Sequence, residues 1–370
     1  MSLYMEAPQK LPDFWLWEER RKKQGLVSFT LELTPRCNNA CRHCYINLPA
    51  GDGQAREREL DFDGIKKIVD EAAELGAMWC LITGGEPLLR EDFEDIYLYI
   101  KRKGIFVSVF TNATLISEKH VQLFKKYPPR ALEITVYGVT EKTYGAVTGK
   151  PELFAAFMRG VRLLLDAGVP LSLKTVMIRS NVHEFQEIAA FCRAHSSEPF
   201  RFDPFIHLRF DRDEKRNQEI REERLSPEAI VALEHSDSAR HDALQKNCEK
   251  LVFNEDMDNP EGFLFGCGAG ISEFYVNHEG FFMLCASLYG SGLLYDLKNG
   301  TIKNALDDFV PKIRAMRTTK TEYMANCGRC RIINLCLWCP AHAFLEMGQL
   351  DACVDYFCSV AKERYKKMLL

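Results

Sequence analysis

An alternation of apolar runs and amphipathic stretches between residues 27 and 205 constrains this chain more than any other feature. Six apolar runs have the length and composition of strands, at 27–33, 78–83, 106–110, 131–137, 171–177 and 200–205. Stretches with helical periodicity separate them, at 61–75, 91–103, 117–126, 151–167 and 182–194. Near-continuous apolar strands that alternate with helices predict a parallel sheet covered by helices. We therefore expect an α/β fold in which six β/α units curl into a partial, TIM-like barrel.

The rest of the chain divides into three further segments. Residues 1–26 predict a short lead with one amphipathic helix around 14–23. Residues 206–260 predict a charged helical connector, because 211–224 is dense in both charge signs and Ser226-Pro227-Glu228 can cap and open a helix. We interpret this charge run as solvated. Residues 261–370 predict a small α+β domain, rich in cysteine and short strands.

Charge and composition exclude several function classes. A net charge of −4 over 370 residues gives no basic field for nucleic acid or an anionic membrane. No apolar run is long enough to span a bilayer, and the N-terminus lacks the apolar core of a signal peptide. We therefore expect a cytoplasmic protein with neither nucleic acid nor membrane as a partner. Its 14 cysteines then favour metal or iron–sulfur ligation over disulfides, because the cytoplasm keeps thiols reduced.

Three of these cysteines, Cys37, Cys41 and Cys44, follow the first predicted strand within one short loop. In parallel β/α folds the chemistry lies at the carboxyl ends of the strands, which is where this loop begins. Three thiols with no fourth nearby can hold three irons of a cubane cluster and leave one iron without a protein ligand. The competing interpretations are half of a zinc site or scattered buried thiols, although zinc would need a fourth ligand at short spacing.

Two motifs together resemble the radical S-adenosylmethionine (radical SAM) enzymes. The first is the cysteine spacing with His43 before the last thiol, and the second is Thr83-Gly84-Gly85-Glu86-Pro87, one β/α unit later. The second resembles the GGEP element, which holds the methionine amine of the cofactor in that family. Glycines let the backbone approach a ligand closely, although alone they also suit a strand-to-helix turn. The resemblance implies a SAM-binding 4Fe–4S cluster, reductive cleavage of SAM to a 5′-deoxyadenosyl radical, and hydrogen abstraction from a substrate.

Further cofactor contacts are expected at the ends of later strands. Thr111 and Asn112 end the third predicted strand, although they also suit a turn. Thr135 and Lys174 lie on the fourth and fifth strands, and a lone lysine in a strand is often solvated instead. Asp203 ends the sixth strand and is the candidate catalytic residue. The expected cofactor-binding residues are Gly84, Gly85, Glu86, Pro87, His43, Tyr45, Thr111, Asn112, Thr135 and Lys174, with His43 and Tyr45 at the adenine.

A second field of cysteines in residues 261–370 resembles the SPASM extension, which binds auxiliary 4Fe–4S clusters in enzymes that modify peptides and proteins. The resemblance rests on Cys-x12-Gly-x4-Cys followed by Cys-x2-Cys-x5-Cys-x2-Cys and a distal Cys. It departs from the family in having two rather than three residues before Cys339, and in lacking a cysteine near Glu273. One or two zinc ribbons are the competing interpretation, because Cys-x2-Cys pairs suit zinc equally.

The resemblance divides these cysteines between one or two auxiliary iron–sulfur clusters. An outer cluster is expected at Cys327, Cys330, Cys336 and Cys358. An inner cluster is expected at Cys267, Cys285 and Cys339, with Cys248, Cys353 or no residue as the fourth ligand.

The expected function is that of a post-translational maturase, which abstracts hydrogen from a peptide or protein. Only 26 residues precede the first predicted strand, too few for a winged-helix domain, so a separate leader-binding protein is expected to present the peptide. The expected electron donor is a flavodoxin or ferredoxin. A sulfatase-maturase-like oxidase is disfavoured because Ala286 follows Cys285 where those enzymes carry an acid. Two less favoured hypotheses are a radical SAM enzyme acting on a small metabolite and a zinc-stabilised, non-catalytic binding protein.

Overall fold

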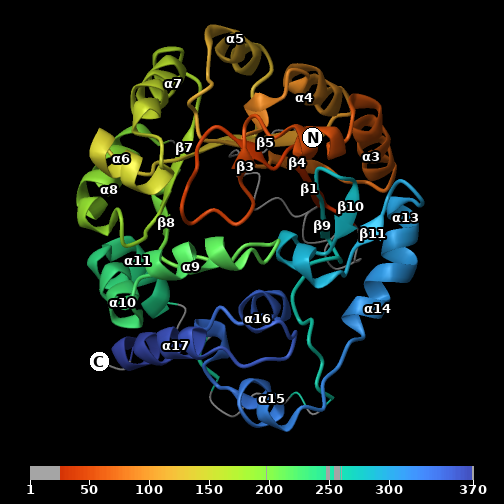
Figure 1. Ribbon diagram of the computed structural model, residues 1–370, viewed down its shortest axis with the longest axis vertical. Helices are drawn as coiled ribbons and strands as arrows, with labels where there is room; N and C mark the ends of the chain where they lie inside the picture. The colour runs from red at the N-terminus through yellow and green to blue at the C-terminus, as the bar shows by residue number, and fades with distance from the viewer. Residues whose placement is uncertain (1–25, 197, 247–250, 254–258, 260, 369–370) are drawn as a thin grey trace, which may run out of the picture.

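A single curved sheet organises the molecule (Figure 1). The computed structural model describes residues 26–368 except 197, 247–250, 254–258 and 260. Strand order in the sheet is β11-β10-β9-β1-β4-β5-β6-β7-β8. Neighbouring strands from β9 through β1 to β8 are parallel, whereas β10 and β11 are antiparallel additions. The strands are β1 Ser28–Glu32, β4 Trp79–Thr83, β5 Phe106–Thr111, β6 Ala131–Thr135, β7 Ser172–Val176, β8 Arg201–Asp203, β9 Glu273–Val276, β10 Phe281–Met283 and β11 Tyr295–Asp296.

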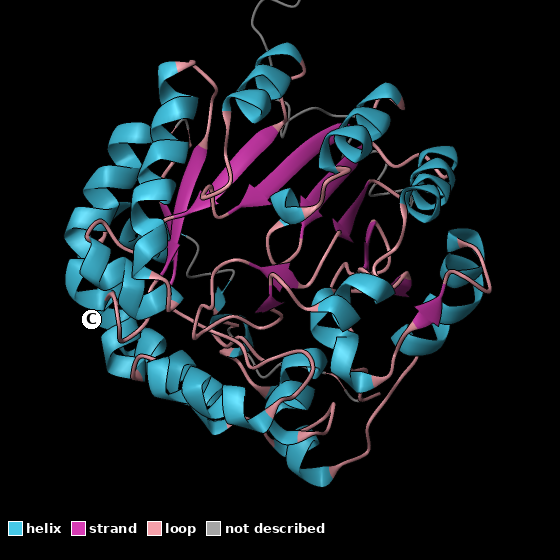
Figure 2. Cartoon of the chain, turned by 45° about the horizontal axis from the view of Figure 1, so that its top comes forward, coloured by secondary structure: helices cyan, strands magenta, loops and turns pink. Residues whose placement is uncertain are grey.

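Helices cover the convex side of the parallel strands, as Figure 2 shows. α3 illustrates how the sequence builds them: Asp61 caps its first turn, and Ile65, Ile68 and Val69 are buried on one face. The predicted partial barrel of six β/α units is confirmed, with element boundaries within about two residues of those expected for most elements. The outer helices are α3 Phe62–Glu74, α4 Phe93–Arg102, α5 Glu118–Lys126, α6 Glu141–Thr148, α7 Phe154–Asp166 and α8 Phe185–His195.

The cysteine loop crosses the open end of this barrel. It lies between β2 (Arg36–Cys37) and β3 (Leu48–Pro49), which pair in a small parallel sheet of their own. The short helix α2 (Gly53–Arg58) follows and leads into α3. The loop therefore begins and ends at fixed points near the carboxyl end of β1.

The Cys-rich region is joined to the barrel through the sheet itself. β9 pairs in parallel with β1, with Thr30 opposite Tyr275, so the sheet crosses the expected boundary between residues 27–205 and 261–370. The stacked rings of Phe29 and Phe274, 5.6 Å apart, reinforce this junction. The remaining helices of this region are α13 Ile302–Asn304, α14 Val310–Arg314, α15 Thr321–Ala325, α16 Pro340–Met347 and α17 Asp355–Met368.

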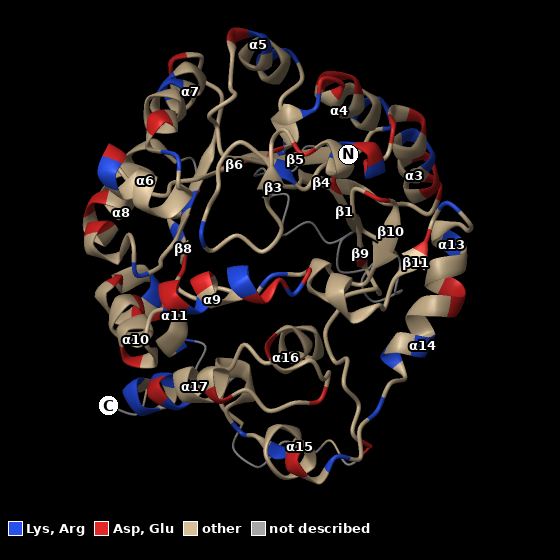
Figure 3. Cartoon of the chain, in the orientation of Figure 1, with Lys and Arg blue, Asp and Glu red and all other residues tan. Residues whose placement is uncertain are grey.

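The charged segment after the barrel forms helices α9 (Glu214–Glu223), α10 (Pro227–Ser236) and α11 (Ser238–Lys246). Charged residues are frequent on α9, and Figure 3 shows them where this helix crosses below the barrel. The expectation that this run is a solvated connector is wrong for one face of α9. Asn217, Ile220 and Glu223 recur at helical spacing and are buried.

Two further expectations concern the chain ends and membranes. The predicted lead helix around 14–23 lies outside the described residues. Within the described part of the chain, no helix has both the length and the apolar character needed to cross a bilayer.

Candidate functional site

Three thiols of the cysteine loop share one buried environment. Cys37 and Cys41 are buried and Cys44 is half-buried. Burial raises the pKa of Cys41 far above its ordinary value, and the neighbouring thiols of Cys37 and Cys44 raise it further. Burial likewise raises the pKa of Cys37, followed by the charges of Glu86 and Cys44. Every cysteine in the described residues is unbridged.

This donor set fits an iron–sulfur cluster. Burial disfavours the ionisation of a thiol, but a bound metal compensates the charge of the thiolate and so favours it. Iron in such clusters is held by cysteine thiolates. Among the described residues, no group of three or more His, Cys, Asp or Glu side chains is arranged so that it could hold a metal ion. The match to a cluster is therefore one of donor chemistry, through soft ligands from one short loop, and not of a preformed geometry.

The glycine turn after β4 lies directly against the backbone that leads into the cysteine loop. Gly85 N donates to Thr34 O at 2.7 Å, and Glu86 N donates to Arg36 O at 2.9 Å. A Cβ atom on Gly84 would lie 2.4 Å from Thr34 O, and one on Gly85 would lie 2.3 Å from Arg36 O. The glycines thus permit a close approach between two protein segments, in addition to the approach to a ligand that we expected.

Glu86 is buried at this junction and links the glycine turn to the end of β5. Its Oε1 accepts hydrogen bonds from Leu88 N at 3.1 Å and Thr111 Oγ1 at 2.8 Å, and its Oε2 accepts one from Asn112 N at 2.7 Å. Burial raises its pKa to about 7, although these hydrogen bonds oppose the shift. A carboxylate offers about four acceptor sites, so one site on Oε2 remains for a ligand donor.

Asn112 extends the link to the cysteine loop. Its Nδ2 donates to Asn38 Oδ1 at 2.9 Å and lies 3.6 Å from Cys37 Sγ. Pro87 begins a short 3₁₀ turn, Pro87–Leu89, that carries the chain away from the site. The structure therefore brings together Gly84, Gly85, Glu86, Thr111, Asn112 and Cys37, which the sequence analysis had assigned to one site.

Residues around α9 clamp the cysteine loop from the other side, and they are functional residues that the sequence motifs did not predict. Arg209 Nη1 donates to Cys44 O at 3.2 Å and to Asn47 Oδ1 at 3.1 Å. Arg216 Nη2 donates to Cys41 O at 3.1 Å, and Arg42 forms an ion pair with Glu223 at 3.2 Å. The available signal was the helical spacing of Asn217 and Ile220 within the charge run.

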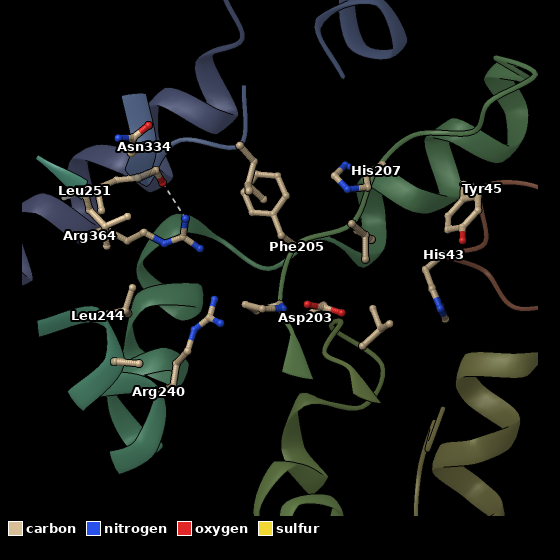
Figure 4. A pocket seen from close by; sticks show the side chains of 16 residues that line it. His43, Tyr45, Asp203, Phe205, His207, Arg240, Leu244, Leu251, Asn334 and Arg364 are labelled. Atoms are coloured by element: carbon tan, nitrogen blue, oxygen red, sulfur yellow. Dashed lines mark hydrogen bonds between the residues drawn. The ribbon is translucent and has the colours of Figure 1, made fainter. Parts of the chain in front are cut away.

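His43, Tyr45 and Asp203 line one cavity of about 670 Å³ at the mouth of the barrel. Figure 4 shows Asp203 at its centre, with His43 and Tyr45 on one side. Burial lowers the pKa of His43 to about 4, so its imidazole is neutral at pH 7. Val176 at the end of β7 and Phe205 beyond β8 also line the cavity, which therefore opens at the carboxyl ends of the last barrel strands.

The structure gives Lys174 different surroundings from those expected. Lys174 Nζ bonds Glu133 Oε1 at 2.8 Å and lies 3.8 Å from the centre of the Phe110 ring. Thr135 is the last residue of β6 and pairs in register with Lys174. The contacts of Lys174 are thus with other strands, not with the glycine turn or the cysteine loop, and the solvated interpretation is also wrong because its side chain is 14% exposed.

The expected outer auxiliary set lies around one hollow. Cys327, Cys330, Cys336 and Cys358 line a cavity of about 400 Å³ between α15 and α17, and Cys353 lines it too. The sulfurs of Cys327 and Cys353 are 3.5 Å apart. Cys353 therefore lies with the outer thiols and not with the inner set, for which it was a candidate fourth ligand.

The expected inner set also converges. Burial raises the pKa of Cys285 to about 12, and the charges of Cys339 and Cys267 contribute to the shift. Burial raises the pKa of Cys339 to about 11, with a further contribution from Cys267. Cys248, the other candidate for the fourth ligand, lies outside the described residues.

Comparison with known proteins identifies the barrel. Residues 31–192 match the family model of the radical SAM superfamily, which includes the cysteine loop and the glycine turn. Residues 31–192 form a radical SAM domain. This domain carries the motifs on which the resemblance rested.

Longer similarities extend beyond the radical SAM domain. The "AdoMet-dependent heme synthase" of Nitratidesulfovibrio vulgaris is 26% identical over 345 residues, which cover 86% of this chain and 88% of that protein. The "Antilisterial bacteriocin subtilosin biosynthesis protein AlbA" of Bacillus subtilis is 28% identical over 47% of this chain and 38% of its own length. The SAM-bound crystal structure of Streptococcus suis SuiB shares the fold with a TM-score of 0.65 and 14% identity, over 97% of this chain and 83% of its own.

Proposed function

We propose that this radical SAM enzyme binds a 4Fe–4S cluster at Cys37, Cys41 and Cys44 and abstracts hydrogen from a carboxylate-bearing tetrapyrrole. The observation that carries the proposal is the set of two buried thiols and one half-buried thiol, beside the 670 Å³ cavity at the barrel mouth, in which Cys37 and Cys44 oppose the ionisation of Cys41. When bound, the cluster and SAM supply the 5′-deoxyadenosyl radical. The protein contributes binding, orientation and exclusion of water.

The residues around the glycine turn have a binding role in this proposal. The free acceptor site of Glu86 Oε2 accepts a hydrogen bond from the methionine ammonium of SAM, and the Gly84 and Gly85 backbone shapes the contact. Thr111 and Asn112 hold Glu86 in place for this contact. His43 and Tyr45 contact the adenine, because they line the cavity next to the cysteine loop.

Asp203 and the outer and inner cysteine sets have further roles in this proposal. Asp203 faces the cavity from the end of β8 and orients the substrate there. We propose that the outer and inner cysteine sets bind auxiliary iron–sulfur clusters, with Cys353 added to the outer set. Lys174 is left out of the cofactor site, since Glu133 and Phe110 already hold it.

Full-length similarity supports a tetrapyrrole over a peptide. The heme synthase matches 86% of this chain, whereas the subtilosin biosynthesis protein matches 47%. A small metabolite as substrate is also one of the hypotheses that the sequence leaves open. The cavity wall is largely apolar, with arginine side chains at one end, which suits a flat apolar body with anionic arms.

Loss of one loop thiol tests the radical chemistry. Cys41→Ala removes a ligand, whereas Cys192→Ala removes an equally buried thiol on α8, away from the site. After anaerobic reconstitution, we expect Cys41→Ala to lose 5′-deoxyadenosine release from SAM under reductant and Cys192→Ala to keep it. Retained cleavage in Cys41→Ala would overturn the role of the loop.

The substrate is tested by stimulation of that cleavage. Reconstituted enzyme, reduced by flavodoxin or ferredoxin as the expected electron donors, is incubated with SAM and either an iron porphyrin that carries propionate arms or candidate peptides. We expect the porphyrin to accelerate 5′-deoxyadenosine release and to change in mass. Acceleration by a peptide alone would reject the tetrapyrrole and restore the maturase hypothesis.

A further inference from the structure

Two arginines share one carboxylate at the end of the 670 Å³ cavity away from the cysteine loop. Glu234 on α10 accepts hydrogen bonds from Arg364 Nε at 2.9 Å and Arg364 Nη2 at 2.8 Å. It also accepts one from Arg240 Nη2 at 3.1 Å. Arg240 on α11 and Arg364 on α17 both line the cavity, and Figure 4 shows their guanidinium groups on the same side of it.

Among the described residues, the hydrogen bonds and ion pairs of this cluster leave one positive charge uncompensated. Glu234 is fully buried, and its single negative charge is divided between two guanidinium groups. The nearby Asp237 forms an ion pair with Arg193 and therefore does not neutralise Arg240. Partly desolvated charge without a partner is unfavourable, so an anion at this place would be bound with a gain in free energy.

The two arginines differ in how many of their donors are already used. Arg364 donates two hydrogen bonds to Glu234 and a third to Leu335 O at 2.7 Å, and it is buried. Arg240 donates through Nη2 alone, its side chain is 38% exposed, and its Nε has no acceptor among the described residues. Arg240 is therefore the arginine whose guanidinium is still partly available to a ligand, and Arg364 fixes the carboxylate that holds it.

The far side of the same cavity differs in chemistry. His43 and Tyr45 lie there, next to the cysteine loop, and place two aromatic rings at that end of the cavity. Phe205, Leu244 and Leu337 contribute apolar surface to the wall. The cavity thus offers a cationic end, an apolar wall and an end near the radical source.

We propose that Arg240 binds a carboxylate arm of the substrate and thereby directs the opposite end of the molecule toward the cysteine loop. The inference rests on the proposed function for its substrate class. Arg240 is the binding residue, and Glu234 and Arg364 are positioning residues that act through it. A carboxylate matches the planar fork of a guanidinium and can accept two parallel hydrogen bonds from it.

Binding of an iron-free porphyrin tests this without relying on catalysis. The reconstituted full-length enzyme is titrated with a porphyrin that carries free propionate arms, and with the same porphyrin as its methyl ester, following porphyrin fluorescence. We expect Arg240→Gln to weaken binding of the free acid about tenfold to a hundredfold, as loss of a charge-assisted hydrogen bond implies. The ester should bind the wild type and Arg240→Gln equally.

Two further variants keep the test decisive. Arg240→Lys retains the charge without the fork and should fall between the wild type and Arg240→Gln. Arg56→Gln removes an exposed arginine paired with Glu91 on another face and should leave both titrations unchanged. Circular dichroism of each variant establishes that it is folded, and Arg240→Lys carries the test if Arg240→Gln is not.

The outcomes separate this inference from the proposed function. Free-acid binding that Arg240→Gln and Arg240→Lys leave unchanged overturns the role of Arg240 while the tetrapyrrole stands. Failure of the wild type to bind either porphyrin rejects the substrate class, and this inference with it. A matching loss of SAM affinity in Arg240→Gln would assign the arginine to the cofactor carboxylate and overturn the proposal.

Discussion

Cys37 and Glu86, at the mouth of the barrel, each carry an ionisable group in surroundings that disfavour its charged form. Cys37 and Glu86 interact electrostatically, and burial is the largest cause of the pKa shift of each. Neither has a cationic partner among the hydrogen bonds and ion pairs of the described residues. A cationic ligand group near Glu86, and a metal at the thiols, would each relieve this cost.

The burial of Glu86 predicts a pH dependence of stability in the cofactor-free protein. Its pKa is raised to about 7 in the folded chain, so the folded state binds more protons than the unfolded state between that value and the ordinary value. Stability should therefore fall as pH rises from about 5 to about 8, by about 3 kcal/mol from this group. Urea unfolding at several pH values measures it.

A matched pair of variants isolates this contribution. Glu86→Gln removes the titrating group and should flatten the dependence in that pH window. Glu91→Gln removes an exposed carboxylate, with 86% of its side chain accessible, and should leave the curve as in the wild type. Equal slopes in all three proteins would contradict the assignment.

The close approach at Gly85 predicts a steric effect. Gly85→Ala would place Cβ 2.3 Å from Arg36 O, so the backbone of the glycine turn or of the cysteine loop must move. We expect the free energy of unfolding to fall by about 3 kcal/mol and SAM affinity to fall with it. Calorimetric unfolding and equilibrium dialysis of SAM are the measurements. Gly53→Ala, where no atom lies within 4 Å of the new Cβ, is the control and should behave as the wild type.

At the scale of elements, α9 and the segment before it act as a strap on the cysteine loop. Arg209 bonds the backbone at Cys44 and the side chain of Asn47, and Phe210 N donates to Tyr45 O at 3.0 Å. The loop between β2 and β3 has little regular structure to hold it, because each of these strands is two residues long. Its shape therefore depends on contacts from a segment more than 160 positions later.

Loss of the contact between Arg209 and the cysteine loop is expected to speed the release of iron. Arg209→Ala frees the carbonyl of Cys44 and leaves Asp211, which Arg209 holds at 2.6 Å, without its partner. We expect the reconstituted protein to release iron to a chelator several-fold faster than the wild type, because the ligand loop is less well oriented. Lys215→Ala changes an exposed residue of α9 and serves as control. Iron release at the wild-type rate in Arg209→Ala would show that the strap does not hold the loop.

Sequence periodicity predicted the elements that are long and regular. The periodicity predicts the strands and helices of the barrel because each of these elements buries one or both of its faces. The strands β9, β10 and β11 have two to four residues each, too few for a period to show, so their joining to β1 was not foreseen. Sequence motifs likewise placed Cys37 and Gly85 in one site, but the Lys174–Glu133 pair depends on register between strands.

At the scale of the whole molecule, the continuous sheet makes the barrel and the Cys-rich region structurally dependent. β1 has the radical SAM strand β4 on one edge and β9 on the other. The same strand leads into the cysteine loop, and β10 leads into Cys285. The thiols of the cysteine loop and Cys285 therefore follow two strands of one sheet, which β9 separates and pairs with on both sides.

This dependence predicts that damage to β9 spreads into the barrel. Phe274 is buried between Phe29 at 5.6 Å and Phe282 at 5.0 Å, so Phe274→Ala removes the packing that joins β1, β9 and β10. We expect a loss of about 4 kcal/mol in stability and faster amide exchange in β1 and β4 as well as in β9. Phe263→Ala, at a 38% exposed ring, is the control and should leave exchange unchanged. Faster exchange confined to β9–β11 would show that the Cys-rich region opens independently of the barrel.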